Sequence, residues 1–229
     1  MSSQAGTSII NIDRFCFHPL AKRGLLWSDQ GTLLVADLHL GKEATFCRGG
    51  IAVPRGATAG TLQMITEMLV ESSASTLVIL GDLFHARSSL AADIRQSFDE
   101  FLKRHRDVHV VLVKGNHDKS TGSLPTHWPM QIVDAPWSVD GVSLAHYPSP
   151  PSVGTQLCIA GHLHPAIRLR GAGERKLPCF YFDADMRCIT LPAAGEFTGT
   201  AMIRPKTNDR VWGISEDEVV ELDPRLLAK

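Results

Sequence analysis

The stretch Leu33-Leu34-Val35-Ala36-Asp37-Leu38-His39 decides the fold, because an apolar run ends there in two side chains that commonly bind metals. Residues 33–36 are apolar at every position, which is typical of a central strand buried on both faces. In open α/β sheets, ligands bind beyond the carboxyl ends of the strands. The stretch therefore predicts an α/β sheet with a polar site after this strand.

Four further segments repeat the pattern of a strand followed by metal-binding side chains. They are Gly81-Asp82, Gly115-Asn116-His117-Asp118, Ala145-His146 and Gly161-His162-Leu163-His164. Taken alone, each has an ordinary interpretation, such as a turn or a helix N-cap. Together with Asp37 and His39 they supply carboxylates, an amide and enough imidazoles for two metal ions, with one histidine left for chemistry. Their coincidence at successive strand ends predicts a metallohydrolase.

The spacing within two of the segments also suggests how the ligands converge. The pairs Asp37-x-His39 and His162-x-His164 are alternate residues, which point to the same side of an extended segment. Loops at a common sheet edge would then bring all five segments together. A mixed nitrogen and oxygen set without thiolate suits Mn, Fe or Zn. Two such ions about 3.5–4 Å apart activate a water and clamp the oxygens of a phosphoryl group.

The surrounding sequence alternates strands and helices, as a parallel sheet requires. Strands are expected over residues 15–18, 24–27, 32–36, 76–80 and 108–113, with helices over 58–71 and about 90–102. Later strands are expected over 139–145, 156–160, 166–169, 179–182 and 187–191, followed by a closing hairpin over 211–214 and 219–222. We expect residues 1–229 to form a single domain, with the motifs in about 32–165 and the strands and hairpin of 166–229 included.

Composition limits the classes of protein that the chain can be. The net charge of −1 gives no support for general coating of polyanions. Five cysteines without a CxxC pair favour reduced thiols and a cytoplasmic protein over a disulfide framework. The N-terminal residues do not read as a signal peptide, and no apolar run is long enough to span a bilayer, so we expect no membrane partner.

The order D-x-H, G-D, G-N-H-D, H and G-H-x-H resembles the calcineurin-like metallophosphoesterase family, over roughly residues 33–165. The details Ala-Asp-Leu-His-Leu-Gly-Lys, Gly-Asp-Leu-Phe-His and Gly-His-Leu-His-Pro resemble its bacterial branch associated with DNA ligase and a helicase in repair gene clusters. Members of that branch are described as DNA endonucleases or phosphoesterases. The resemblance therefore implies a DNA-repair-associated hydrolase with those proteins as partners.

The resemblance also implies a fold and a role for each motif residue. The fold is a four-layer αββα sandwich, within the α/β (α+β) class. The first of two metals, for which we expect Mn with Fe or Zn as alternatives, is held by Asp37, His39, Asp82 and His164. The second is held by Asp82, Asn116, His146 and His162. A bridging hydroxide attacks phosphorus, His117 assists the leaving group, and Asp118 orients His117, which suits a general acid near neutral pH.

The substrate is less defined by the sequence than the reaction. The protein-phosphatase continuation of Gly-Asp is absent, because residues 83–87 read Leu-Phe-His-Ala-Arg. Lys42, Arg48 and Arg55 are candidate phosphate contacts, and His85 either lines the pocket or begins a helix. Alongside DNA cleavage, hydrolysis of a small nucleotide and a metal-stabilised non-catalytic role in a repair complex stay open. Assays on each substrate class separate these three hypotheses.

Overall fold

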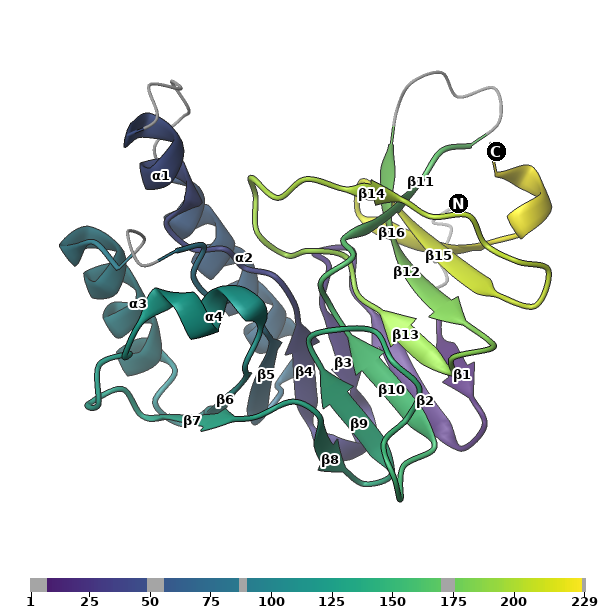
Figure 1. Ribbon diagram of the computed structural model, residues 1–229, viewed down its shortest axis with the longest axis horizontal. Coiled ribbons are helices and arrows are strands. Elements are labelled where there is room, and N and C mark those ends of the chain that lie inside the picture. Colours follow the sequence, from purple (N-terminus) through teal and green to yellow (C-terminus); the bar gives the residue numbers. More distant parts are fainter. Residues whose placement is uncertain (1–7, 49–55, 87–89, 170–175, 228–229) are drawn as a thin grey trace, which may run out of the picture.

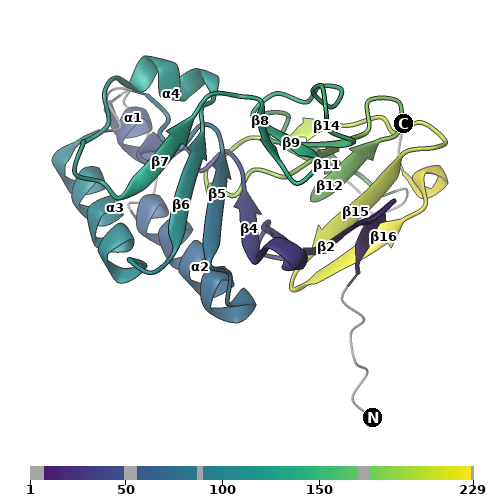
Figure 2. The same cartoon turned by 90° about the horizontal axis from the view of Figure 1, so that it is seen from below.

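A computed structural model describes residues 8–48, 56–86, 90–169 and 176–227 of the 229-residue chain. Two β-sheets face each other across a shared core, and the α-helices gather on the outer side of the first sheet (Figures 1 and 2). Within the described ranges, no helix is long and apolar enough to cross a bilayer. The α/β sandwich expected from the motifs is therefore confirmed.

The described part of the first sheet has seven strands in sequential order, β1 to β7. They are β1 (Ile10–Ile12), β2 (Phe15–Pro19), β3 (Leu25–Trp27), β4 (Thr32–Val35), β5 (Thr76–Leu80), β6 (His109–Val113) and β7 (Met130–Val133). Strands β1 to β4 pair antiparallel, and β4 to β7 pair parallel. The parallel half is the one that the alternation of strands and helices predicted.

Two long helices cover the outer face of this parallel half. They are α2 (Ala57–Ser72) and α3 (Ala92–Arg104), and both follow the apolar spacing predicted from the sequence. On α2, Ile65 and Met68 pack against Leu33 and Leu77 of the sheet. The shorter helices α1 (Lys42–Arg48) and α4 (Asn116–Thr121) were not predicted, because one or two turns leave no apolar periodicity to detect.

The described part of the second sheet has nine strands, in the order β14-β11-β12-β13-β10-β9-β8, with β15 pairing to β12 and β16 to β15. Their bounds are β8 (Trp137–Val139), β9 (Val142–Ala145), β10 (Leu157–Ala160), β11 (Pro165–Ile167), β12 (Leu177–Asp183), β13 (Cys188–Thr190), β14 (Ala201–Met202), β15 (Arg210–Ser215) and β16 (Glu218–Leu222). Strands β9, β10 and β13 run parallel to one another. The hairpin expected at 211–222 is β15 with β16.

One predicted strand is a hairpin. Residues 139–145 were expected to be continuous, but β8 ends at Val139 and β9 begins at Val142. Asp140 and Gly141 lie between them with φ of 41° and 81°. Positive φ at both central residues is what a two-residue type I′ turn requires, and Asp-Gly is a favoured sequence for it.

The core between the sheets comes from alternate residues of both. Leu34 and Val78 face inward from the first sheet and meet Ile159, Phe180 and Ile189 of the second. On the outer face of the second sheet, Leu227, which follows the 3-10 helix η3 (Pro224–Leu226), packs with Ile167, Cys179 and Tyr181.

Candidate metal centre

All seven expected ligands lie at one end of the sandwich. They follow β4, β5 and β6 of the first sheet and β9 and β10 of the second. The site is therefore built from the facing edges of two sheets, whereas the sequence suggested a single edge. Their carboxyl ends meet because β4, β5 and β6 are mutually parallel, as are β9 and β10.

The ligand-bearing backbone is left-handed rather than extended. Asp37, His39, Asp82, His162 and His164 have φ of 55°, 46°, 52°, 70° and 48°. The extended geometry expected for the two alternate pairs is therefore wrong, although each pair does bring its side chains into the site. A non-glycine residue in this region costs roughly 1–2 kcal/mol. The strand ends thus adopt a strained conformation that turns polar side chains inward.

The first ligand set consists of Asp37, His39 and His164, whose ligand atoms lie within 4.8 Å of one another. Asp37 is fully buried, and its Oδ2 accepts a hydrogen bond from the backbone N–H of His162 at 2.8 Å. Its Oδ1 has no hydrogen-bond partner in the described residues and lies 3.3 Å from Nε2 of His164. Burial, assisted by the charge of Lys42, lowers the pKa of His39 to about 2, which keeps the ring in the neutral form that binds metal.

The second ligand set consists of Asp82, His146 and His162, joined by Asn116. Nε2 of His146 lies 3.0 Å from Oδ1 of Asn116, 3.1 Å from Nδ1 of His162 and 3.5 Å from Oδ2 of Asp82. The other nitrogen of His146, Nδ1, lies 3.0 Å from the carbonyl oxygen of Leu80. Four atoms that can bind one cation therefore converge on the Nε2 side of His146.

Asp82 lies between the two sets. Its Oδ1 accepts a hydrogen bond from the backbone N–H of His117 at 2.9 Å. Its Oδ2 lies 3.8 Å from Nε2 of His39 and 3.5 Å from Nε2 of His146. One carboxylate oxygen therefore faces a ligand of each set, which is the placement that a bridging ligand needs.

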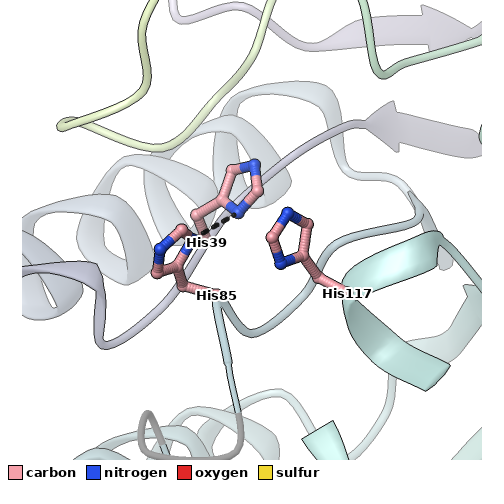
Figure 3. Close-up of side chains that lie close together, drawn as sticks. All are labelled: His39, His85 and His117. Atoms are coloured by element: carbon pink, nitrogen blue, oxygen red, sulfur yellow. Dashed lines mark hydrogen bonds between the residues drawn. The ribbon is translucent and has the colours of Figure 1, made fainter. Parts of the chain in front are cut away.

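A third group of histidines adjoins the first set. Figure 3 shows His39, His85 and His117 facing one another. Nδ1 of His85 lies 3.4 Å from Nδ1 of His39, and the His85 ring stacks on His117 with centroids 5.1 Å apart. His85 lies in a bend, and α3 begins only at Ala92. The structure thus brings His85 into the site.

His117 and Asp118 start α4 but are not paired as expected. His117 is about one-third exposed, with Nε2 3.9 Å from Oδ2 of Asp82. Among the described residues, the Asp118 carboxylate accepts hydrogen bonds from the backbone N–H groups of Asp82, Leu83 and Gly115 at 2.8–3.0 Å, and none from the His117 ring. Two of these donors belong to the Gly-Asp loop, so Asp118 positions that loop.

The structure describes only some of the residues that were expected to contact phosphate. Lys42 is half-buried and lines a small cavity together with His39, and its Nζ lies 5.8 Å from the centroid of the Phe46 ring. Arg48 ends α1, but its side chain lies outside the described residues, as does the whole of Arg55. Tyr147 directly follows His146, is half-exposed and donates a hydrogen bond to Oδ1 of Asn116 at 2.9 Å.

The donor atoms fit two divalent cations. The buried Oδ1 of Asp37 has no hydrogen-bond partner in the described ranges, and such an atom is costly unless a cation or donor reaches it. Carboxylate and imidazole ligands lie at both positions, the Asn116 amide lies at the second, and none of the candidate ligands is a thiolate. The site can therefore carry out two-metal hydrolytic chemistry.

Comparison with known proteins agrees with this geometry. The family model for the calcineurin-like phosphoesterase matches residues 32–187. The crystal structure of Pseudomonas putida nuclease MPE is 35% identical, with a TM-score of 0.82, and the match covers 94% of this chain and 99% of that one. The DNA double-strand break repair protein Mre11 of Archaeoglobus fulgidus is 32% identical over 96 residues, which are 41% of this chain and 20% of that protein. This chain belongs to the calcineurin-like phosphoesterase family, whose members are binuclear metal-dependent phosphoesterases.

Proposed function

We propose that this protein is a two-metal phosphodiesterase that cleaves DNA. The observation that carries the proposal is the position of Asp82 Oδ2 between two sets of metal-binding atoms, with His117 beside it. The near full-length likeness to a bacterial nuclease supports the choice of a phosphodiester in DNA as substrate. The shorter match to a repair protein supports a place in DNA repair.

In this proposal, one ion binds Asp37, His39, Asp82 and His164, and the other binds Asp82, Asn116, His146 and His162. Manganese is our first choice, and the same donors suit iron or zinc. When bound, the two ions supply Lewis acidity to the phosphoryl group and activate water for attack. The remaining steps fall to side chains around the ligands.

His117 is the proposed general acid. Its ring is open to solvent on one side and faces Asp82 on the other, so it reaches both the site and an incoming ester. It would donate a proton to the oxygen that leaves phosphorus. Asp118 contributes indirectly, because its hydrogen bonds fix the Gly-Asp loop against the start of α4. Lys42 and His85 would contact the phosphate oxygens.

The test is hydrolysis of bis(p-nitrophenyl) phosphate by the manganese-loaded protein. We expect Asp82→Asn and His117→Ala to lose about 100-fold or more in kcat, as removal of a metal bridge or a general acid does. Asp140→Asn and His127→Ala are matched surface controls, because both side chains are at least half exposed and outside the site. Full activity in either site variant contradicts the mechanism.

A small nucleotide is the second candidate substrate, favoured by the net charge of −1, which is low for a nucleic-acid-binding protein. Parallel assays on single-stranded DNA, cyclic nucleotides and monoesters distinguish the two. We also propose a cytoplasmic setting with DNA ligase and a helicase as partners. Stoichiometric partner binding by a metal-loaded protein without turnover on any phosphoester would instead favour a non-catalytic role.

A further inference from the structure

The segment Ala193–Gly199 connects β13 to β14 and has no role in the proposed chemistry. It leaves the second sheet and reaches toward the helices of the first before returning (Figure 1). At its far point, the backbone N–H of Glu196 lies 3.4 Å from Oγ1 of Thr61 on α2. Arg23 approaches its start, donating to the Ala193 carbonyl at 3.2 Å. We call this segment the strap.

The strap pairs with the backbone that carries Asp37. The N–H of Ala194 donates to the Ala36 carbonyl at 2.9 Å, and the N–H of Gly195 donates to the Asp37 carbonyl at 3.2 Å. Both bonds lie just after β4, where the chain turns into its left-handed conformation. The strap therefore holds the main chain on each side of the Asp37 side chain.

The other end of the strap holds His164. The Gly199 carbonyl lies 3.0 Å from Nδ1 of His164, and the N–H of Ala201 donates to the His164 carbonyl at 3.0 Å. A carbonyl can only accept, so Nδ1 carries the proton and Nε2 is free to bind metal. Nε2 is the atom that faces Asp37, at 3.3 Å.

Glycine at position 195 is what allows the close approach. A Cβ there would lie 2.3 Å from the Leu38 carbonyl oxygen and 3.0 Å from that of Asp37. Both are backbone atoms, which cannot move aside as a side chain can. A Cβ at Gly199 would meet no atom within 4 Å. The two glycines of the strap thus provide a crowded position and an open one in the same segment.

We propose that the strap is a positioning segment for the first metal ion. Asp37 belongs to the first sheet and His164 to the second, and the strap is hydrogen-bonded to both, so it sets the distance between them. Asn116, His146 and His162 of the second set make no hydrogen bond to the strap in the described residues. The proposal rests on the two-metal site of the proposed function and assigns the strap to one ion of the two.

The experiment measures manganese bound per protein, by elemental analysis and titration calorimetry, in wild type, in Gly195→Ala and in Val70→Ala, a control at an exposed position of α2 outside the strap. We expect two ions in wild type and in Val70→Ala. In Gly195→Ala, one ion should bind as in wild type and the other about 10–100-fold more weakly, as for lost support of a metal ligand. The electron paramagnetic resonance spectrum should change accordingly from that of a coupled manganese pair to that of a single ion.

Double variants show which ion is affected. Combined with His164→Ala, which already removes a first-set ligand, Gly195→Ala should cause little further loss. Combined with His162→Ala, it should weaken the remaining ion. If the loss is equal in both backgrounds, or if Gly195→Ala binds two ions as tightly as wild type, the proposal is wrong. The effects of substitutions at independent sites add, so a smaller loss in the His164→Ala background shows that Gly195 and His164 act on the same ion.

If circular dichroism shows that Gly195→Ala does not fold, a second variant tests the proposal. Arg23→Ala removes the hydrogen bond to the Ala193 carbonyl and the charge that attracts Glu196 of the strap, and it should weaken the first ion alone by a few-fold. Unchanged binding in Arg23→Ala would then overturn the proposal. A wild-type protein that binds fewer than two ions contradicts the proposed function itself, so the two failures are distinguishable.

Discussion

The two ligand sets hold themselves together in different ways. In the second set, Nε2 of His146 lies 3.0–3.1 Å from Asn116 and His162, and Tyr147 adds a hydrogen bond to Asn116 from outside. In the first set, the closest approach between ligand atoms of Asp37 and His164 is 3.3 Å, and Oδ1 of Asp37 has no hydrogen-bond partner in the described residues. The ligand side chains therefore contact one another more closely in the second set than in the first.

The difference has an energetic consequence. A buried polar atom without a hydrogen bond costs about 1–3 kcal/mol. In the first set that cost falls on Asp37, whereas in the second set Oδ1 of Asn116 accepts a hydrogen bond from Tyr147 and Nδ1 of His146 donates one to the Leu80 carbonyl. The first position should therefore gain more stability from its ion, and the second should keep its shape better without one.

The largest expected effects come from removing one ligand of each set. His164→Ala and His162→Ala should each reduce phosphodiester hydrolysis by roughly 10³-fold, since one Lewis acid is worth several kcal/mol in the transition state. Elemental analysis should find one ion in each variant. Wild-type turnover in either would show that one set has no part in catalysis.

Removing the ions should destabilise the folded protein. A ligand present at 100 times its Kd contributes about 2.7 kcal/mol, so stripping with a chelator should lower Tm measurably. We expect His164→Ala to recover less stability than His162→Ala when manganese is restored, because only the latter retains the ion beside Asp37. Calorimetric scans with and without manganese measure the recovery of Tm in each variant. Equal recovery in the two variants would show that the two ions stabilise the fold equally.

Asp118→Asn should destabilise the folded protein and disturb both sets of metal ligands. Its carboxylate accepts three backbone N–H groups, two of them from the loop that carries Asp82. An amide retains one acceptor oxygen and brings hydrogens toward those donors, so we expect a loss of about 1–3 kcal/mol in the free energy of unfolding. Urea denaturation of the metal-free protein checks this, with Asp140→Asn as the surface control.

Tyr147→Phe should have the smallest effect. It removes one hydrogen bond to Asn116 and leaves the ring beside His162, with centroids 4.3 Å apart. A single hydrogen bond contributes about 0.5–1.5 kcal/mol, which corresponds to a few-fold weaker binding of the second ion. Titration calorimetry of the metal-free variant measures it. A change confined to the first ion would contradict the separation of the two sets.

The sequence predicted where ligands lie better than how the chain brings them there. Strand ends are visible as apolar runs that stop at Asp37, Asp82 and His146, so the edge of the fold could be anticipated. The left-handed backbone at Asp37 and His164 could not, because Asp and His occur in extended as well as left-handed backbone and do not mark either one. The backbone contacts of Asp118 were likewise hidden, since they depend on the Gly-Asp loop lying beside α4. Helices as short as α4 carry no periodic signal.

The left-handed ligand residues also bear on how this enzyme would respond to laboratory evolution. Glycine adopts positive φ without steric cost, whereas five metal-binding positions hold Asp or His, which adopt it less readily than glycine. A library screened for heat resistance in the presence of a chelator should therefore accumulate glycine at positions such as Asp37 and His39, and lose its metal ligands first. Sequence changes that stabilise the protein and changes that preserve activity point in opposite directions at this end of the sandwich.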